Sequence, residues 1–241
     1  MTYAIEARAL SKSYGTCAAV QAIDLRIRPG ELYALLGING AGKSTTIRLL
    51  SCLAKPTGGD ALLLGHSIRT EPNQIKQELS VSPQESAVAP NLTVQENLEL
   101  MAGIYGIPAP RSQAEVTLRR FGLEAVAKRR AKVLSGGWQR RLSIAMALIS
   151  QPKILFLDEP TLGLDVLARR ELWQAIRELK GKTTCILTTH DLAEARALAD
   201  RIGILVHGQL AAEGTVAELL ALAETSQWED AFVKLAGGVN G

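Results

Sequence analysis

The stretch ELYALLGINGAGKSTTIRLL, residues 31–50, changes character twice along its length. An apolar run comes first, a glycine-rich loop follows, and a segment that favours helix completes it. This order predicts a buried strand, a tight loop and a helix. Gly37, Gly42, Lys43 and Ser44 fit the pattern G-x-x-x-x-G-K-S/T, in the strand–loop–helix setting that the pattern requires.

The pattern predicts a site for the phosphates of a nucleotide. Its glycines allow successive backbone N–H groups to point at phosphate oxygens, and the start of the helix adds partial positive charge. Lys43 would bring a full charge to the β- and γ-phosphates, and the Ser44 hydroxyl would be a ligand of Mg²⁺. The residues expected to bind the cofactor here are Gly37, Asn39, Gly40, Ala41, Gly42, Lys43, Ser44 and Thr45.

Composition places the chain among ordinary globular proteins. Its 241 residues suffice for one large domain or a domain with a subdomain, and 47% of them are apolar. A net charge of +3 is too small to indicate a nucleic-acid partner, and none is expected. The three cysteines are far apart, without a C-x-x-C pair, so they predict free thiols in a reducing cytosol and no metal cluster.

The sequence shows no segment that would place the chain in a membrane. The N-terminus lacks the charged start and apolar run of a signal peptide. The longest uncharged apolar runs fall far short of the roughly 20 residues that a spanning helix needs. We therefore expect a cytoplasmic protein that would reach the inner face of the cell membrane only through a partner.

The remaining chain alternates between strand and helix patterns, with one helical interruption. Residues 3–10 and 19–27 alternate in polarity as antiparallel strands do, and 201–214 is expected to form a hairpin that turns at Gly208. The block 88–150 is almost entirely helical in pattern, so we interpret it as an inserted subdomain. We expect one domain over 1–241, with an α/β core (1–87 and 151–214), this helical subdomain (88–150) and C-terminal helices (215–241).

Several helix starts carry a capping box, in which a polar N-cap and a Glu three residues later satisfy free N–H groups. The expected pairs are Thr93/Glu96, Asp191/Glu194, Thr215/Glu218 and Ser226/Glu229. The helical block also carries a basic run that includes Arg140 and Arg141. This run would favour an anionic membrane surface or a docked membrane protein, unless it simply forms a solvated helix face.

Two short apolar runs end in residues suited to hydrolysis. ILFL, residues 154–157, is followed by Asp158 and Glu159, and adjacent carboxylates at the tip of a buried strand are costly without a task. We assign Asp158 to the Mg²⁺ shell and Glu159 to the attacking water, as base or positioner. The alternative is a pair of acids that merely precede a helix.

Three further residues are weaker candidates on their own. His190 ends the apolar run 183–189 and could contact the γ-phosphate, although a lone histidine is more often structural. Gln84 ends another short strand and is a candidate for both the metal and the cofactor. Tyr14 could stack on a base, but a surface tyrosine in a turn is equally consistent with the sequence.

A second glycine pair stands at Gly136 and Gly137, directly after Ser135, where a helix is expected to open. Glycine costs a helix about 1 kcal/mol relative to alanine. Two in succession indicate that something must approach the backbone closely.

Together these segments resemble the ATP-binding subunits of ABC transporters, over about residues 3–213. GINGAGKST (37–45) is similar to the family's Walker A loop, and ILFLDEP (154–160) to its Walker B strand. The other matching segments are SKSYG (11–15), VSPQ (81–84), LSGGWQRRLSIAMALI (134–149), LGLD (162–165) and TTH (188–190), which resemble the adenine-stacking loop, the Q-loop, the signature, the D-loop and the switch histidine. They occur in the family's order.

The resemblance implies a P-loop core of the RecA-like type, with a mostly parallel sheet, N-terminal antiparallel strands and an inserted helical subdomain. It implies ATP and Mg²⁺ as cofactors and a head-to-tail dimer of two such chains. Ser135, Gly136 and Gly137 of one chain would then cap the γ-phosphate held by the other, with Asp165 in the D-loop beside it. Trp138 departs from the family's usual Gln, and Ile38 from its usual Pro.

The function implied is ATP hydrolysis coupled to transport by a separately encoded membrane permease. Residues 92–108 and 228–238 resemble subunits of bacterial exporters of the drug, antibiotic and polysaccharide type, which favours export. The alternative is a soluble ABC-type ATPase in cofactor assembly or another non-transport process. A non-hydrolysing nucleotide-binding module is a third possibility, against which Glu159 and His190 argue.

Overall fold

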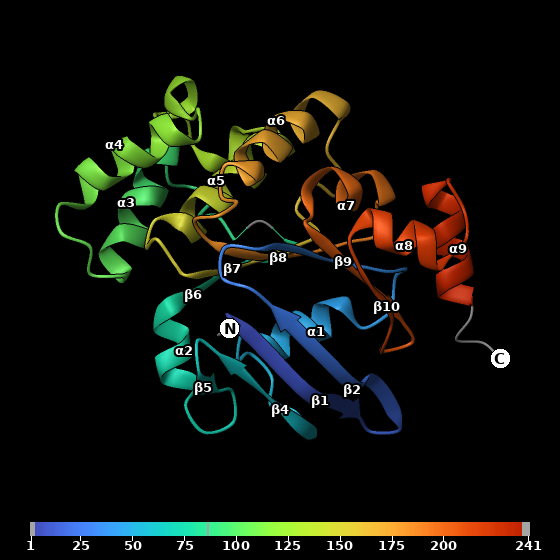
Figure 1. Cartoon of the computed structure of the whole chain (residues 1–241). Coiled ribbons are helices and arrows are strands. Elements are labelled where there is room, and N and C mark those ends of the chain that lie inside the picture. Colours follow the sequence, from blue (N-terminus) through green and yellow to red (C-terminus); the bar gives the residue numbers. More distant parts are fainter. Residues whose placement is uncertain (1–2, 86, 238–241) are drawn as a thin grey trace.

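The computed structural model describes residues 3–85 and 87–237, and in these residues two sheets face each other (Figure 1). The smaller sheet is antiparallel, with the strand order β2-β1-β4-β5. Its strands are β1 (Ile5–Tyr14), β2 (Cys17–Ile27), β4 (Gly58–Leu63) and β5 (His66–Ser67). The expected N-terminal antiparallel strands are thus confirmed.

The larger sheet has the order β10-β9-β3-β8-β7-β6. Its strands are β3 (Leu32–Leu36), β6 (Leu79–Ser82), β7 (Ile154–Asp158), β8 (Thr184–Thr189), β9 (Arg201–Val206) and β10 (Gln209–Gly214). All neighbours are parallel except β9 and β10, which form the expected hairpin. Because β6, β7, β8 and β3 run in one direction, their carboxyl ends lie at one edge of the sheet.

Helix α1 (Lys43–Leu50) lies between the two sheets (Figure 1). Its Ile47, Leu49 and Leu50 join a core with the inward side chains of β1, β2 and β4. Strand β3 is buried on both faces, so Tyr33 and Leu35 enter this core while its other residues face the second one. A parallel strand covered on both sides requires the unbroken apolar run seen in its sequence.

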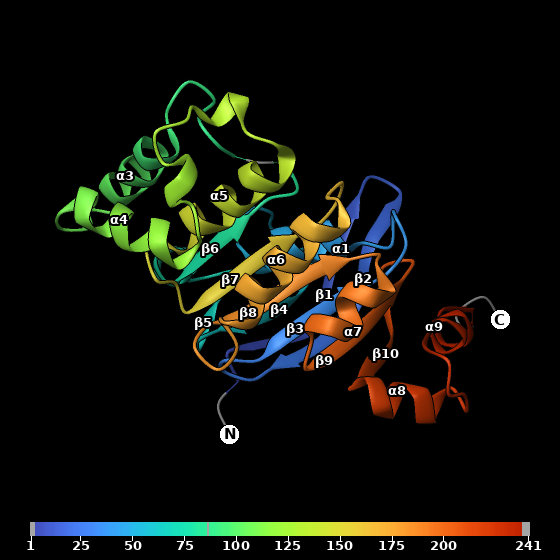
Figure 2. The same cartoon turned by 90° about the horizontal axis from the view of Figure 1, so that it is seen from above.

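Helices α3 (Val94–Ile104), α4 (Pro110–Arg120) and α5 (Gly136–Leu148) gather at one end of the molecule (Figures 1 and 2). The Thr93/Glu96 capping box opens α3 as expected. Residues 121–135 form turns and two short 3-10 helices rather than regular helix, which corrects part of the expectation for 88–150. Helix α5 packs on β6 and β7 and so attaches this group to the sheet.

The second core lies on the other face of the larger sheet, under α6 (Val166–Arg177) and α7 (Leu192–Leu198). Helix α2 (Pro72–Glu78) packs beside β5 and β6. The expected C-terminal helices are α8 (Val216–Leu222) and α9 (Trp228–Gly237), while residues 238–241 lie outside the described part. No helix in the described residues is long and apolar enough to span a bilayer.

The other capping boxes have mixed outcomes. Thr215 and Glu218 form theirs. Asp191 caps α7, but the Glu194 carboxylate does not return to it, because it accepts hydrogen bonds from Thr161 and Trp173 in the interior. Burial raises the pKa of Glu194. Helix α9 begins at Trp228, so Gln227 rather than Ser226 directly precedes it.

The contact of α9 with the core gives a test of stability. Trp228 is 2% exposed, and its Nε1 donates to the Leu192 carbonyl at 2.9 Å. We expect Trp228→Ala to destabilise the protein by about 3 kcal/mol or more. Val233→Ala on the same helix, where the side chain is 66% exposed, should change stability by less than roughly 0.5 kcal/mol. Thermal unfolding of both variants measures this, and equal midpoints would show that α9 does not stabilise the core.

Candidate active site

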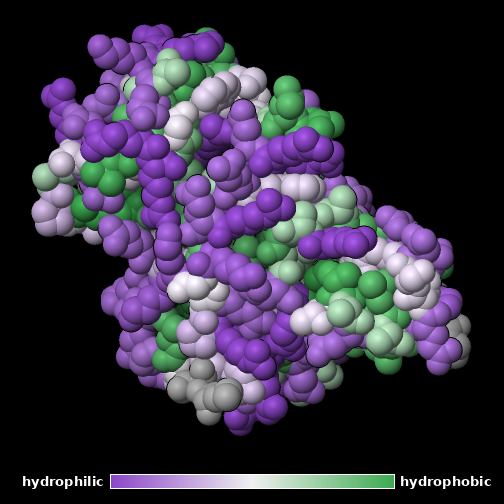
Figure 3. All heavy atoms as spheres, turned by 45° about the horizontal axis from the view of Figure 1, so that its top comes forward, coloured by the Kyte–Doolittle hydropathy of each residue, from purple (hydrophilic) through white to green (hydrophobic). Residues whose placement is uncertain are grey.

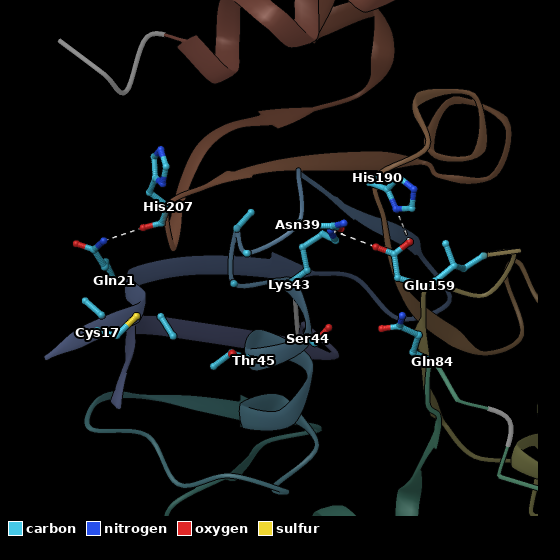
Figure 4. A pocket seen from close by; sticks show the side chains of 16 residues that line it. Cys17, Gln21, Asn39, Lys43, Ser44, Thr45, Gln84, Glu159, His190 and His207 are labelled. Atoms are coloured by element: carbon cyan, nitrogen blue, oxygen red, sulfur yellow. Dashed lines mark hydrogen bonds and ion pairs between the residues drawn. The ribbon is translucent and has the colours of Figure 1, made fainter. Parts of the chain in front are cut away.

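The carboxyl ends of four parallel strands surround one cavity of about 650 Å³ (Figure 4). Strand β3 leads into the glycine loop, β6 into Gln84, β7 into Glu159 and β8 into His190. The predicted site residues that line this cavity are Asn39, Gly40, Ala41, Gly42, Lys43, Ser44, Thr45, Gln84, Glu159 and His190. Positions up to 151 residues apart in the sequence (39 to 190) therefore meet at one sheet edge, where α/β proteins bind their ligands.

The glycine loop takes a path that larger residues would block. Gly42 has φ +102°, and a Cβ there would lie 2.4 Å from the Ala19 carbonyl oxygen. A Cβ at Gly37 would lie 2.4 Å from the Leu205 carbonyl oxygen, although Gly37 itself does not line the cavity. Gly42 is also the N-cap of α1 and brings no side chain to it. The first N–H groups of α1 therefore have no partner within the helix, as a phosphate site requires.

Lys43 and Glu159 form a buried ion pair in the centre of the cavity. The Lys43 Nζ lies 3.1 Å from Glu159 Oε1 and donates to the carbonyls of Gly37 and Ile38 at 2.7 and 3.2 Å. The other Glu159 oxygen lies 2.9 Å from His190 Nδ1, and the His190 ring is half-exposed. The carboxylate thus bridges the loop lysine and the histidine.

Glu159 stands on an unusual stretch of backbone. Its φ is +47°, in the left-handed region that residues with a side chain rarely adopt. The Glu159 N–H lies 3.0 Å from Thr188 Oγ1 and 3.2 Å from the Thr188 carbonyl. Strained conformations persist where surrounding bonds fix them, and they concentrate at functional sites.

The group formed by Ser44 and Asp158 fits Mg²⁺. Asp158 Oδ1 accepts a hydrogen bond from Ser44 Oγ at 3.1 Å and another from Thr188. Gln84 lines the same cavity across from Ser44 (Figure 4). Hydroxyl, carboxylate and amide oxygens are hard ligands of the kind that Mg²⁺ takes beside phosphates. With Lys43 and the free N–H groups next to them, these residues suit a magnesium–nucleoside triphosphate.

Tyr14 is not among the residues that line the cavity. It ends β1 with its ring exposed, and the Lys12 ammonium lies 4.9 Å from the ring centroid. The wall next to the loop is instead formed by Cys17, Ala18, Ala19, Gln21 and His207. Sequence reasoning missed these residues and had no signal for them, because β2 and the β9–β10 turn meet at the loop only in the tertiary structure. The Gly208 N–H donates to the Ala41 carbonyl, and the Gln21 N–H donates to the Gly208 carbonyl.

The second glycine pair lies away from the cavity. Ser135 is the N-cap of α5 and makes no side-chain capping bond, and both it and Gly136 are exposed. A Cβ at Gly136 would meet nothing within 4 Å, whereas one at Gly137 would lie 2.9 Å from the Ala168 Cβ of α6. The close neighbour of Gly137 therefore belongs to its own chain, and Ser135 and Gly136 remain available to a second molecule.

Two nearby residues have clear roles within the chain. The Asp165 side chain caps α6 and accepts from the N–H groups of Leu167 and Ala168, both at 2.9 Å. Trp138 packs against the second core and has the Arg141 guanidinium 5.0 Å from its ring centroid. Arg141 also pairs with Glu171 on α6.

Known proteins resemble this chain in sequence and in fold. The family model described as "ABC transporter" matches residues 20–162. The daunorubicin/doxorubicin resistance ATP-binding protein DrrA of Streptomyces peucetius is 44% identical over 90% of this chain and 67% of its own length. The probable multidrug ABC transporter ATP-binding protein YbhF of Escherichia coli K12 is 39% identical over 96% of this chain, which spans only 41% of that protein.

A solved structure extends the comparison to the fold. The ATP-binding cassette MJ0796, described as dimeric in a post-hydrolysis state with ADP and Pi, aligns with a TM-score of 0.80 at 29% identity. The alignment covers 88% of this chain and 98% of that one. The chain belongs to the ABC transporter family as one of its ATP-binding, ATP-hydrolysing domains.

Proposed function

We propose that this chain is the ATPase subunit of an exporter, and that two copies close head to tail around two ATP molecules. The observation that carries the proposal is the buried bridge from Lys43 through Glu159 to His190 beside the glycine loop. These three residues line one cavity, where Lys43 would offer a cation to phosphate, Glu159 a carboxylate to water, and His190 a partner for that carboxylate. The printed names of DrrA and YbhF, which concern drug resistance and multidrug transport, support export.

The ion pair suggests how binding prepares hydrolysis. Lys43 is held by Glu159 and by two loop carbonyls, so a triphosphate must compete with these groups for the ammonium. When the Lys43 ammonium binds the phosphates in place of Glu159, Glu159 Oε1 becomes free to accept a hydrogen bond from the attacking water. His190 remains hydrogen-bonded to Glu159 Oε2 and fixes the direction in which the carboxylate points. Mg²⁺ held by Ser44, Asp158 and Gln84 would neutralise charge on the β- and γ-phosphates.

In the proposed dimer, each chain offers Ser135 and Gly136 to the nucleotide of its partner, because these residues lie outside its own cavity. Ser135 and Gly136 present a side-chain hydroxyl and free backbone N–H groups at an exposed helix start, where a partner's γ-phosphate would be received. The exposed apolar residues Leu162, Val166 and Leu167 surround Asp165 in the sequence and suit a second copy. Elsewhere the face seen in Figure 3 is largely polar, with separate apolar patches. The dimeric structure of the MJ0796 cassette supports this arrangement.

A membrane partner is part of the same proposal. The described residues contain no helix that could cross a bilayer. In the proposal, the membrane-spanning part of the transporter is a separate permease. We propose a cytoplasmic location at the inner face of the membrane, held there by the permease. The competing function is a soluble ABC-type ATPase without a permease, for example in cofactor assembly.

Loss of the loop lysine should abolish tight nucleotide binding. We expect Lys43→Ala to weaken ATP binding by about 100-fold or more, because the buried ammonium is the full charge offered to the phosphates. Arg48→Ala is the matched control, since Arg48 lies exposed on the same helix, and it should keep wild-type affinity. Titration with a fluorescent ATP analogue measures both. Unchanged affinity in Lys43→Ala would remove the glycine loop from the site.

Loss of the catalytic carboxylate should trap the dimer. We expect Glu159→Gln to bind ATP but to lower turnover at least about 100-fold, because the amide cannot accept a proton from water. ATP then persists, and gel filtration with ATP should show a dimer that ADP does not produce. A variant that stays monomeric with bound ATP would contradict the two-chain site.

The partner decides between the exporter and the soluble alternative. We expect a tagged chain, expressed with its neighbouring genes and purified from membranes in mild detergent, to bring down a polytopic membrane protein in near-equal amount. Lys43→Ala serves as a control, because it should still dock while losing ATPase activity. An active ATPase that never carries a membrane protein would favour the soluble alternative.

A further inference from the structure

Arg140 on α5 is a buried cation that the proposed chemistry leaves without a task. Arg140 is only 4% exposed, although it lies about one helical turn after the exposed start of α5 at Ser135 and Gly136. In the part of the chain that the structure describes, no carboxylate lies within 4 Å of its guanidinium. Burying a charge without a direct counter-ion is costly, so the hydrogen bonds of this group must be favourable.

All the hydrogen-bond partners of Arg140 are main-chain carbonyls of the active site. Its Nη2 donates to Asp158 at 2.6 Å and its Nε to Pro160 at 2.9 Å. Its Nη1 donates to Pro83 and, at 3.2 Å, to Gln84. One guanidinium thus joins the end of β7, the residue after Glu159 and the loop that carries Gln84.

These bonds bear directly on the strained residue between them. Glu159 has φ +47°, and Arg140 holds the carbonyl of the residue before it and of the residue after it. The Glu159 N–H is meanwhile held by Thr188. The conformation that aims this carboxylate at Lys43 and His190 is therefore held at two peptide groups, the one between Asp158 and Glu159 and the one between Pro160 and Thr161, as a strained site requires.

A second contact joins α5 to the strand that leads into the Gln84 loop. Ser143 lies one turn after Arg140, and its Oγ is 3.2 Å from that of Ser82 in the interior. Ser82 ends β6 immediately before Pro83 and Gln84. Helix α5 is thus tied to the end of β6 and to this loop at two points, and Ser135 and Gly136 lie at its N-terminal end, about one turn before Arg140.

We propose that Arg140 is a positioning residue for ATP hydrolysis, which holds the backbone on both sides of Glu159 and couples it to the Gln84 loop and to α5. The inference rests on the proposed function. A movement of α5, when Ser135 meets the partner's ATP, then reaches Gln84 and Glu159 of the same chain through one side chain. The fork of the guanidinium is essential, because a lysine has a single ammonium and cannot reach all three segments.

The test compares Arg140→Lys and Arg140→Gln with the wild type, and Arg141→Gln is the matched control. Arg141 is the next residue on α5, but it pairs with Glu171 and lies over the Trp138 ring, and within the described residues it makes no hydrogen bond to the three segments that Arg140 joins. For Arg140→Gln we expect kcat to fall about tenfold or more while KM for ATP stays within about threefold, because Arg140 does not touch the glycine loop. Arg140→Lys should lie between this variant and the wild type, and Arg141→Gln within about twofold of the wild type.

Thermal unfolding accompanies the kinetics, so that loss of fold is not mistaken for loss of positioning. A folded Arg140→Lys with wild-type kcat would overturn the proposal, as would a KM that rises in step with the fall in kcat. An Arg140→Lys chain that does not fold would also overturn it, by giving Arg140 a purely structural role. A wild type that binds ATP without hydrolysing it would instead contradict the proposed function, and this role with it.

Discussion

The active site depends on parallel hydrogen bonding between β3, β8, β7 and β6. Parallel pairing brings the carboxyl ends of these strands to one edge, and each strand continues into a functional segment. The pairing also keeps the segments in register, since Leu36 lies beside Thr189 and Asp158 beside Thr188. The four strands therefore bring Lys43, Gln84, Glu159 and His190 to one side of the cavity, and β2 and the β9–β10 turn form the wall next to the loop. The segments that follow the strands carry the functional side chains, and the register of the sheet fixes their relative positions.

Around this edge, buried charges are compensated in two different ways. Lys43 and Glu159 form a direct ion pair and satisfy their remaining bonds with loop carbonyls and His190. Arg140 instead takes carbonyl groups, and the more distant charges of Asp158, Glu194 and Glu159 favour its protonated form against the burial that lowers its pKa. The first arrangement can be opened by a phosphate that competes for Lys43. The hydrogen bonds of Arg140 to main-chain carbonyls leave no side chain for a ligand to displace, so they suit a residue that holds the backbone in place.

Much of the fold follows from local patterns, and the failures have identifiable causes. The apolar runs before Asp158 and His190 predict β7 and β8, because a parallel strand covered on both faces must be apolar throughout. The Asp191/Glu194 box fails because Thr161 and Trp173 bind the Glu194 carboxylate in the interior. Arg140 and Arg141 look alike in the sequence, where both belong to one basic run that suits a membrane surface, a docked partner or a solvated helix face. Only the packing of α5 on β6 and β7 buries the first and leaves the second beside Glu171.

The sequence by itself predicted the phosphate loop and the two acids, because each requires particular residue types at short spacing next to a strand. His190 was a weaker candidate from its position alone, and the family resemblance singled it out. The sequence also indicated two separate glycine sites, of which one serves the loop and the other remains at the surface. Only the tertiary structure decided that Cys17, Gln21 and His207 line the cavity while Tyr14 does not. It alone showed that a single arginine supports both sides of Glu159. Those contacts join residues distant in the chain, and distance along the chain leaves no local pattern from which they could be inferred.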